Sequence, residues 1–472
     1  AYQLTAIGNL AGGLLLPLAV FPRVGFAGAQ TLLVGLCLVA ALLAARVAPS
    51  RRALCAAALA LGAALLVVGP PDGHAILTHS PLTGSTDSDA VVFAEMGTSA
   101  SVVLVERRGE WTLRTNGLTE GSIQPPGVAR SRYLVPRWLG MLPFLARPEA
   151  DDVLVIGLGA ATTLEAIPAA VERVTVVEIE RQVVDANRSL AGERATDPLA
   201  DPRVEIVVND ARDVLNRTRR RFDVVVSQPS HPWTAGSANL YTREFFAAVA
   251  ARLSPGGVLA QWVGLPFVDE ALLRSLLATL ADVFEHVEVY RPPTGAAFVL
   301  LASERPLDVG LPEALRPELV ALGVGRREDV AAHWVLDTDG VRRLGEGAGL
   351  VTDDLNLLAS RSPRVLGRAL GRSLAHPVVA EHDPLPAASA ALDRLALVQR
   401  VLPPARRELL ARAEPDPTRR LLALTWLPGG DARRGRSALL TSVLQVEPGD
   451  EVARSALIRS ARPDLAGVAP PP

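Results

Sequence analysis

The hydrophobic positions of this chain fall into long apolar runs at the start and short ones later. Three long runs occupy residues 3–20, 25–45 and 53–69, and the middle run carries no charge over 21 positions. A run of that length can span the hydrocarbon core of a bilayer. Three such runs in succession are unusual for a signal peptide or a buried core helix, so the pattern predicts transmembrane helices over residues 1–72. Because the chain begins inside an apolar run, we expect this segment to be the end of a longer membrane domain.

After residue 72 the apolar positions come in short runs separated by turn residues. A Gly/Pro/Ser/Thr/Asp-rich linker precedes the strings VVFAE, SVVLVE and WTLRT. These strings predict the short strands of a small β domain over residues 73–130. Residues 131–148 favour a helix that leads into the next unit.

Strand and helix patterns then alternate regularly up to residue 302. Strands are predicted at 152–157, 173–180, 203–208, 222–228, 256–263, 286–290 and 296–302, and helices at 162–171, 181–191, 211–220, 241–253 and 269–283. Continuous apolar strands separated by helices are typical of a parallel sheet covered on both faces. We therefore predict an α/β domain over 131–310 with a class I methyltransferase-like (Rossmann-like) seven-stranded sheet. The short loop between the last two strands predicts one antiparallel edge.

The remainder of the chain is less regular. Residues 311–372 show no clear period and are interpreted as a mixed extension. Residues 373–472 are rich in Arg, Ala and Leu and are predicted to form an α-helical tail. Within that tail, residues 437–461 resemble a single tetratricopeptide-type helical hairpin.

Composition and charge exclude several kinds of chemistry. The 472 residues correspond to roughly three domains. The formal net charge of −2 gives no general attraction to nucleic acid, so no nucleic-acid partner is expected. All 48 basic residues are Arg, which excludes lysine Schiff-base chemistry and a P-loop lysine. Two cysteines, Cys37 and Cys55, exclude a disulfide framework and a cysteine-based zinc site, and we predict no metal.

Candidate ligand-binding residues lie where the predicted strands end, because ligands of open α/β sheets bind outside the carboxyl ends of the strands. Gly157 and Gly159 let the backbone approach a ligand closely, although a tight strand–helix turn is an alternative. Glu178 follows Gly159 by 19 residues and is placed to accept hydrogen bonds from the ribose hydroxyls of a nucleoside, or else to form a salt bridge. Asp210 can accept from the exocyclic amine of an adenine, cap the helix that follows, or do both.

The segment SQPSHPW after the fourth predicted strand is a second candidate. Its two prolines fix a rigid loop, and its polar side chains Gln228 and His231 can face a ligand bound beside the strand. A structured turn, in which His231 bonds within its own loop, is the alternative interpretation.

The chain resembles the spermidine synthase family in the order and spacing of five strings: VLVIGLGAATTLEAI, VEIE, DPRVEIVVNDARDVL, FDVVVSQPSHPWTAGSANLYTREFF and LSPGGVLAQW. The similarity is greatest to the branch fused to a membrane transporter-like domain, whose last helices the leading YQLTAIGNLAGGLLLPLAVFP resembles. Residues 352–356 (TDDLN) also resemble an acidic string of that branch. The resemblance covers about residues 1–302 and implies a polyamine aminopropyltransferase, which transfers an aminopropyl group from decarboxylated S-adenosylmethionine to putrescine.

The roles implied by the resemblance agree with those inferred from the residues. Gly157 and Gly159 are expected near the cofactor, Glu178 on its ribose and Asp210 on its adenine. The co-substrate is expected to be decarboxylated S-adenosylmethionine or S-adenosylmethionine, without a metal.

Three departures from the family bear on catalysis. The Asp of the family's glycine loop is Ala160 here, the catalytic Asp after the fourth strand is Gln228, and a second, substrate-binding Asp is His231. The family's Tyr-His-Glu string is also absent from residues 131–141.

The chemistry explains why these departures matter. The attacking amine, with a pKa of roughly 10, must lose a proton before it attacks the methylene beside the sulfonium. A Gln amide is not a useful base, whereas a neutral imidazole at His231 is available near pH 7. Neither supplies the negative charge that would hold a diamine, for which Glu120, Asp353 and Asp354 are candidates.

Two functions therefore stand as hypotheses. The first is a membrane-anchored transferase that moves an aminopropyl or related group to a small-molecule amine or related acceptor. The second is a catalytically degenerate, cofactor-binding or regulatory domain attached to a membrane transporter-like part. An NAD-type oxidoreductase is disfavoured, because the third glycine of the dinucleotide fingerprint is missing. A homo-oligomer stays open.

Charges near the apolar runs bear on localisation. We predict a multi-pass protein of a bacterial-type inner membrane, in contact with membrane lipid. Arg46, Arg51 and Arg52 place the loop between the last two runs in the cytoplasm, which sends the following domain to the other side. A nucleoside co-substrate favours a cytoplasmic domain instead, so the two expectations conflict and the sidedness stays open.

Overall fold

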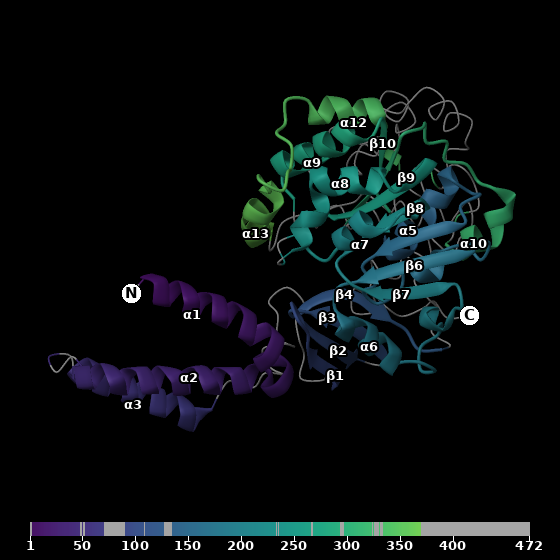
Figure 1. Cartoon of the computed structure of the whole chain (residues 1–472). Helices are drawn as coiled ribbons and strands as arrows, with labels where there is room; N and C mark the ends of the chain where they lie inside the picture. Colours follow the sequence, from purple (N-terminus) through teal and green to yellow (C-terminus); the bar gives the residue numbers. More distant parts are fainter. Residues whose placement is uncertain are drawn as a thin grey trace, which may run out of the picture. The chain divides into compact units, whose positions relative to one another are not determined.

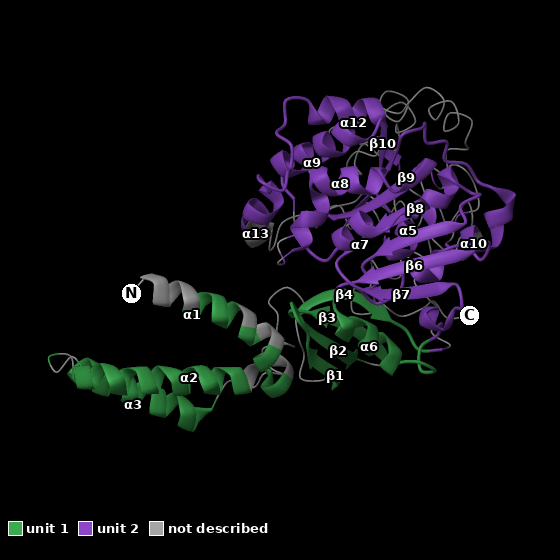
Figure 2. Ribbon diagram, viewed as in Figure 1, with its two compact units in different colours: residues 1–125, 180–194 green, residues 126–179, 195–472 purple. Residues whose placement is uncertain are grey.

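The structure is a computed structural model that describes residues 2–47, 50, 52–69, 90–107, 109–126, 135–232, 234, 236–265, 268–292, 297–322, 324, 330 and 334–369. The chain divides into two compact units (Figure 2). Unit 1 comprises Ala1–Pro125 and Glu180–Arg194, and unit 2 comprises Pro126–Ile179 and Ala195–Pro472. The predicted helical tail and most of the predicted linker lie outside the described residues. The predicted division into five segments stays a prediction.

Unit 1 begins with apolar helices that coincide with the three apolar runs. The helix α1 (Tyr2–Leu15) continues through a π-helical turn (Leu16–Val20) into α2 (Phe21–Val47), and α3 (Arg52–Val68) follows. Among the described residues, one stretch, Gly28–Val47, is long and apolar enough to cross a membrane, with 20 residues and a mean hydropathy of 2.1. The apolar α3 has only 17 residues, so the prediction of several membrane spans is not supported.

The second part of unit 1 is an antiparallel sheet (Figure 1). Its four strands pair in chain order: β1 (Ala90–Met96), β2 (Ser101–Arg107), β3 (Glu110–Thr115) and β4 (Leu118–Ile123). The strand β4 was not predicted for the small β domain, because its sequence LTEGSI has few apolar residues. The turn before it, Asn116–Gly117, has positive φ at both residues (50° and 78°), as a two-residue hairpin turn requires.

A helix from later in the chain completes unit 1. The helix α6 (Arg181–Ser189) contacts β1 and β2. The buried carboxylate of Glu180, directly before α6, accepts hydrogen bonds from the backbone N–H groups of Thr98 (3.0 Å) and Ser99 (2.5 Å). Glu180 therefore holds the β1–β2 turn against the start of the helix.

Unit 2 is built on an eight-stranded mixed sheet with the order β12-β10-β11-β9-β8-β5-β6-β7. Strands β9, β8, β5, β6 and β7 pair in parallel, whereas β11, β10 and β12 pair antiparallel to their neighbours. The strands are β5 (Asp152–Ile156), β6 (Arg173–Glu178), β7 (Val204–Val208), β8 (Phe222–Ser227), β9 (Leu253–Gly264), β10 (His286–Tyr290), β11 (Ala297–Ser303) and β12 (Trp334–Leu336).

The predicted Rossmann-like α/β class and its antiparallel edge are confirmed, but the predicted number of seven strands is wrong. The eighth strand, β12, is only three residues long, which is too short to show a period. All residues of β5 and β11 are buried, and continuous burial of this kind requires cover on both faces of the sheet.

Four helices of unit 2 begin and end close to their predicted positions: α5 (Val135–Ala146), α7 (Ala211–Arg217), α8 (Arg243–Ala250) and α9 (Glu270–Val283). Three more helices, α10 (Arg316–Ala321), α12 (Thr338–Gly345) and α13 (Leu357–Ala369), lie in the mixed extension, for which no helix was predicted. The helix predicted at 162–171 is wrong, because this segment contains only a 3₁₀ turn, η3 (Leu164–Ala166). Pro168 forces Ile167 into an extended conformation (ψ 127°), which ends the turn.

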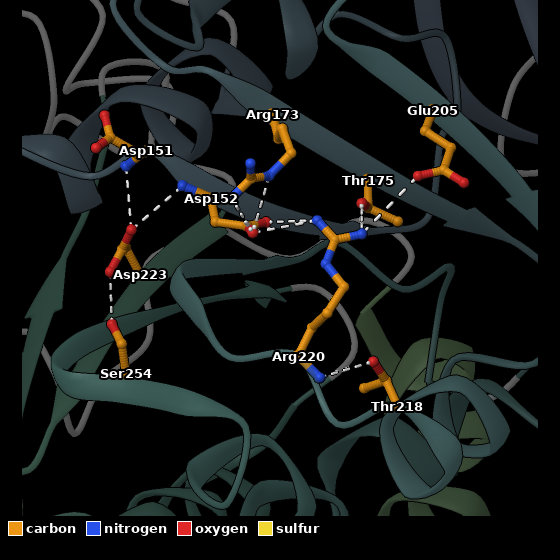
Figure 3. A network of polar contacts seen from close by, with 9 residues as sticks. All are labelled: Asp151, Asp152, Arg173, Thr175, Glu205, Thr218, Arg220, Asp223 and Ser254. Atoms are coloured by element: carbon orange, nitrogen blue, oxygen red, sulfur yellow. Dashed lines mark hydrogen bonds and ion pairs between the residues drawn. The ribbon is translucent and has the colours of Figure 1, made fainter.

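A charged network joins the amino ends of the central strands (Figure 3). The Asp152 side chain is buried, and its carboxylate accepts hydrogen bonds from Arg220 (2.9 and 3.1 Å) and Arg173 (3.0 and 3.2 Å). Two guanidinium groups therefore compensate the buried charge of Asp152.

The neighbouring carboxylate in Figure 3 is that of Asp223 on β8. It accepts from the Ser254 hydroxyl (2.6 Å) and from the backbone N–H groups of Asp151 (3.1 Å) and Asp152 (3.2 Å). Burial raises the pKa of Asp223, but these hydrogen bonds and the charge of Arg147 outweigh it and hold the pKa below its ordinary value.

Candidate active site

The glycine loop after β5 makes a close approach to the loop after β8. Gly157 has a φ of 88°, and a Cβ at this position would lie 2.4 Å from the backbone oxygen of Gln228. The N–H of Gln228 donates to the carbonyl of Ile156 (2.9 Å), and the N–H of Gly157 donates to that of Val177 (2.9 Å). The structure therefore brings together two candidate segments that lie 71 positions apart in the chain.

The tight turn predicted as an alternative for the glycines is present. Gly157 and Gly159 both have positive φ, at 88° and 50°. Ala161 also has a positive φ, of 61°, which is strained for a residue with a Cβ. Backbone strain of this kind gathers at functional sites, and here it lies in the loop for which we predicted ligand binding.

Glu178 ends β6 and points to the same glycine loop. Its carboxylate accepts a hydrogen bond from the backbone N–H of Leu158 (2.8 Å), and the residue is 7% exposed. The hydrogen bond offsets part of the cost of burying the charge. The predicted contact of Glu178 with a ribose stays a prediction, but the carboxylate lies where the loop approaches β6.

An apolar surface lies beside Glu178, and its residues were not among those predicted from the sequence. Ile179 is 57% exposed, and Val208, which pairs with Glu178 across β6 and β7, is 37% exposed. An exposed apolar surface next to a carboxylate suits a ligand with one apolar face and one polar edge, such as a nucleoside. In the sequence, Ile179 between the two acidic residues of VEIE could have indicated this surface.

Asp210 follows β7 and caps α7. Its carboxylate accepts from the N–H of Arg212 (2.7 Å), so the predicted helix cap is confirmed. The exposed Asp210 lines an open pocket of about 530 Å³. The other lining residues are Arg212, Asp213, Asn216, Asn239 and Asp353. The contact of Asp210 with an adenine stays a prediction.

Gln228 lies directly after β8 and is half-buried. Its side-chain oxygen accepts a hydrogen bond from the hydroxyl of Thr163, a buried residue of the glycine loop. The amide is thereby oriented, but it remains uncharged and is not a useful base. Thr163 was not among the predicted site residues, because nothing in the sequence relates it to position 228.

His231 lies in the same loop as Gln228. Its ring lies edge-to-face against Trp262 on β9, with ring centroids 6.2 Å apart and an interplanar angle of 61°. The His231 carbonyl accepts from the N–H of Thr234 (2.9 Å). The backbone therefore forms the predicted structured turn, while the imidazole is placed against an aromatic ring of the neighbouring strand.

Two buried polar side chains lie at the carboxyl ends of the central strands. Ser227 on β8 pairs in register with Gln261 on β9, and both are 0% exposed. Among the described residues, the Ser227 hydroxyl and the Gln261 side-chain oxygen have no hydrogen-bond partner. Because an unsatisfied buried polar group costs about 1–3 kcal/mol, this pair does not stabilise the fold.

Two of the three carboxylates proposed to replace the missing Asp charges, those of Asp353 and Glu120, are already engaged by other side chains. The carboxylate of Asp353 accepts from both terminal nitrogens of Arg212, at 2.7 Å for the first, and from the Thr242 hydroxyl (2.7 Å). Glu120, in unit 1, accepts from the Thr115 hydroxyl. Among the residues that the structure describes, no group of three or more His, Cys, Asp or Glu could hold a metal ion.

Comparison with known proteins matches the central part of the chain to a family domain. Residues 134–296 match the model of the spermine/spermidine synthase domain. The chain is 35% identical over 178 residues to polyamine aminopropyltransferase 2 of Pseudomonas aeruginosa, covering 37% of this chain and 50% of the relative. It is 32% identical over 152 residues to the polyamine aminopropyltransferase of Nitrosomonas europaea, covering 32% of this chain and 46% of the relative. The matched part of the chain is a spermidine synthase family domain.

The extent of these matches is limited. The chain spans about half the length of the curated relatives it matches. A spermidine synthase crystallised with the transition state analogue AdoDATO has a TM-score of 0.47 and 22% identity, with 54% of this chain and 88% of that one covered. Spermidine synthase of Thermotoga maritima has a TM-score of 0.40 and 19% identity, with coverages of 59% and 88%.

Proposed function

We propose that unit 2 binds an S-adenosylmethionine-type nucleoside and transfers an aminopropyl or related group from it to an amine acceptor. The observation that carries this proposal is Glu178, a buried carboxylate held at the glycine loop and followed by the exposed Ile179. The match of residues 134–296 to the spermine/spermidine synthase domain supports it.

In this proposal the nucleoside lies across the carboxyl ends of β5, β6 and β7. Gly157 and Gly159 let the backbone approach it, and Glu178 accepts hydrogen bonds from its ribose hydroxyls. Asp210, exposed at the rim of the pocket, accepts from the exocyclic amine of the adenine. Decarboxylated S-adenosylmethionine is the co-substrate that aminopropyl transfer requires.

The transfer forms one bond and breaks another. The neutral amine nitrogen of the acceptor bonds to the methylene carbon beside the sulfonium. The carbon–sulfur bond breaks, its electron pair stays on sulfur, and methylthioadenosine leaves. The acceptor amine gives up one proton, for which the imidazole of His231 is the available base in the loop after β8.

Gln228 and His231 point to an acceptor that is less cationic than putrescine. A carboxylate binds an ammonium and takes its proton, whereas a Gln amide offers only neutral hydrogen bonds. Asp353, whose carboxylate Arg212 pairs, offers no free charge to replace it.

The test is the release of methylthioadenosine by the purified full chain from decarboxylated S-adenosylmethionine. The acceptor panel contains putrescine and two monoamines of the same chain length, 4-amino-1-butanol and 4-aminobutanoate. We expect release with a monoamine at a rate above that with putrescine, and Gln228→Asp to shift the preference toward putrescine. Nucleoside binding without release from any acceptor would instead favour the catalytically degenerate, regulatory domain.

We also propose that α2 anchors the chain in a membrane. The stretch Gly28–Val47 has only 6% of its residues buried, whereas a core helix of a soluble protein would be mostly buried. Its exposed side chains include Leu33 (60%), Leu36 (67%) and Leu43 (56%). An apolar surface of this extent is unfavourable in water and suits a lipid environment.

Alkaline carbonate extraction of membranes from expressing cells tests the anchor. We expect the full chain to stay in the membrane pellet with its mass unchanged. The double substitution Leu36→Arg with Leu43→Arg should release it, because each Arg at the centre of a span costs about 2.5–3.5 kcal/mol. Leu36→Val with Leu43→Val is the matched control and should stay in the pellet. A soluble chain, or one shortened by cleavage after the helix, would contradict the anchor.

A further inference from the structure

A segment outside the matched family domain is tied to the rim of the candidate site. We infer that residues 351–356, here called the strap, position the pocket at Asp210, and that Asp353 is the positioning residue that acts through Arg212. The family model ends at residue 296, so the strap lies beyond the matched region. The effect of the strap on nucleoside binding rests on the proposed function. Its effect on the structure of the pocket rests on the contacts described below.

The central contact is a bidentate ion pair between α7 and the strap. Both terminal nitrogens of Arg212 donate to the carboxylate of Asp353, which lies 141 positions later in the chain. Bidentate Arg–carboxylate pairs fix geometry as well as charge. The pairing lowers the pKa of Asp353 and raises that of Arg212, so both groups stay charged across the physiological range.

Arg212 also reaches the residue proposed to contact the adenine. Its backbone N–H donates to the Asp210 carboxylate (2.7 Å), while its side chain holds Asp353. The same guanidinium donates to the carbonyl of Asn239 (3.3 Å), in the segment that follows the His231 loop. Arg212 therefore joins the α7 cap, the strap and the segment that follows the His231 loop.

The strap makes a second set of contacts to the start of α8. The Thr242 hydroxyl donates to Asp353 (2.7 Å), and the N–H of Asp353 donates to the Glu244 carboxylate (2.9 Å). The side chain of Asn356 donates to that of Asn239 (3.3 Å). These bonds place Asp353 and Asn239 together on the wall of the 530 Å³ pocket that Asp210 lines.

The strap is itself anchored in the core, so it does not simply follow the loop that it contacts. Val351 is 0% exposed, and its N–H donates to the Thr279 hydroxyl of α9 (2.9 Å). The Val351 carbonyl accepts from the N–H of Arg243 (2.8 Å). A buried anchor on one side and an ion pair on the other make the strap a fixed wall for the pocket.

The test compares Asp353→Asn with Asp282→Asn in the full chain. Asp282 forms an ion pair with Arg243 of comparable exposure, with side chains 37% and 48% exposed against 39% and 27% for Asp353 and Arg212. Asp282 does not line the pocket, so the control removes a similar ion pair whose carboxylate lies outside the pocket. Asp353→Glu is the conservative variant that keeps the charge.

Two readouts separate positioning from general stability. The first is hydrogen exchange of the backbone amides of 211–217 and 237–241, which we expect to accelerate about tenfold in Asp353→Asn only, because the charge-assisted pair is lost. The second is the Kd for methylthioadenosine, which we expect to rise about tenfold in Asp353→Asn, with partial recovery in Asp353→Glu.

The outcomes distinguish the two proposals. Equal exchange and equal Kd in Asp353→Asn and Asp282→Asn would overturn the role of the strap. If the unsubstituted chain binds no nucleoside, the proposed function fails, and hydrogen exchange alone then decides whether Asp353 positions the pocket. Accelerated exchange with an unchanged Kd would overturn the link between the strap and nucleoside binding.

Discussion

The amino ends and the carboxyl ends of the central strands of unit 2 differ in how well their buried polar groups are hydrogen-bonded. At the amino ends, Asp152 and Asp223 are satisfied by guanidinium, hydroxyl and backbone N–H donors (Figure 3). At the carboxyl ends, the backbone has positive φ at Gly157 and Ala161, and the buried hydroxyl of Ser227 has no partner among the described residues.

This difference indicates that the amino ends of these strands contribute to stability, whereas their carboxyl ends serve ligand binding. A satisfied network stabilises a fold, whereas strain and unsatisfied groups persist where a ligand or a reaction requires them. We therefore expect the loss of a polar side chain at the amino ends to lower the free energy of unfolding. The loss of a polar side chain at the carboxyl ends should change it little and act on binding instead, whereas a change that breaks a backbone contact there also lowers it.

The largest effect is expected where the two loops of the carboxyl end touch. Gly157→Ala adds a Cβ 2.4 Å from the Gln228 carbonyl at a φ of 88°, so we expect a loss of about 3 kcal/mol in the free energy of unfolding. Gly192→Ala is the matched control, with a φ of 82° and no atom within 4 Å of the added Cβ. It should cost only about 1 kcal/mol, and equal losses in denaturant unfolding would argue against the close approach.

The next effect tests the amino-end network. Arg220→Ala removes one of the two guanidinium groups that compensate the buried Asp152, and we expect a loss of about 2 kcal/mol. Arg217→Ala removes an exposed ion pair to Asp213 on α7 and should cost about 0.5 kcal/mol or less. Urea unfolding of both variants decides the comparison, and similar midpoints would show that the network adds no stability.

The dependence of stability on pH follows from Asp223. Its pKa is lower in the folded protein than the value of about 3.9 expected for the unfolded chain. The contribution of Asp223 is therefore fully present above the unfolded pKa and is lost as the pH falls through the folded pKa. Asp223→Asn should flatten the acid side of the stability curve between about pH 5 and pH 2. A curve as steep as that of the unsubstituted chain would exclude this role.

The smallest effects compare one serine at each end of the sheet. Ser254→Ala removes the hydroxyl that donates to Asp223 (2.6 Å) and should cost about 1–1.5 kcal/mol. Ser227→Ala removes a buried hydroxyl without a described partner and should leave stability unchanged or slightly raised, by less than about 1 kcal/mol. Thermal unfolding of the two variants measures the difference. A larger loss of stability in Ser227→Ala than in Ser254→Ala would contradict the expected order.

The sheet of unit 2 was predictable because its strands are buried on both faces. Such strands are continuous apolar runs, and β5, β6, β8 and β9 begin and end within a few residues of their predicted limits. The helix predicted at 162–171 failed because the apolar pattern does not report positive φ at Gly159 and Ala161 or the effect of Pro168 on the turn. Short strands such as β12 carry no period at all.

For the candidate site, the sequence predicted which residues lie at the carboxyl ends of the strands but not the contacts between their side chains. Topology placed Gly157 and Gln228 at the same edge of the sheet, since the ends of neighbouring parallel strands meet there. The hydrogen bond between Thr163 and Gln228 and the ion pair between Arg212 and Asp353 depend on side-chain geometry. Contacts between residues 65 and 141 positions apart leave no local pattern from which to predict them.

The most direct test of the central claim is calorimetric titration of the full chain with methylthioadenosine, decarboxylated S-adenosylmethionine and NAD. We compare the unsubstituted chain with Glu178→Gln, in which the amide oxygen can still accept from the N–H of Leu158. We expect binding of the two sulfur nucleosides but not of NAD, and a Kd at least about tenfold higher in Glu178→Gln, because a charged hydrogen-bond acceptor is lost. A folded chain that binds neither sulfur nucleoside, or binds them equally well after Glu178→Gln, would contradict it.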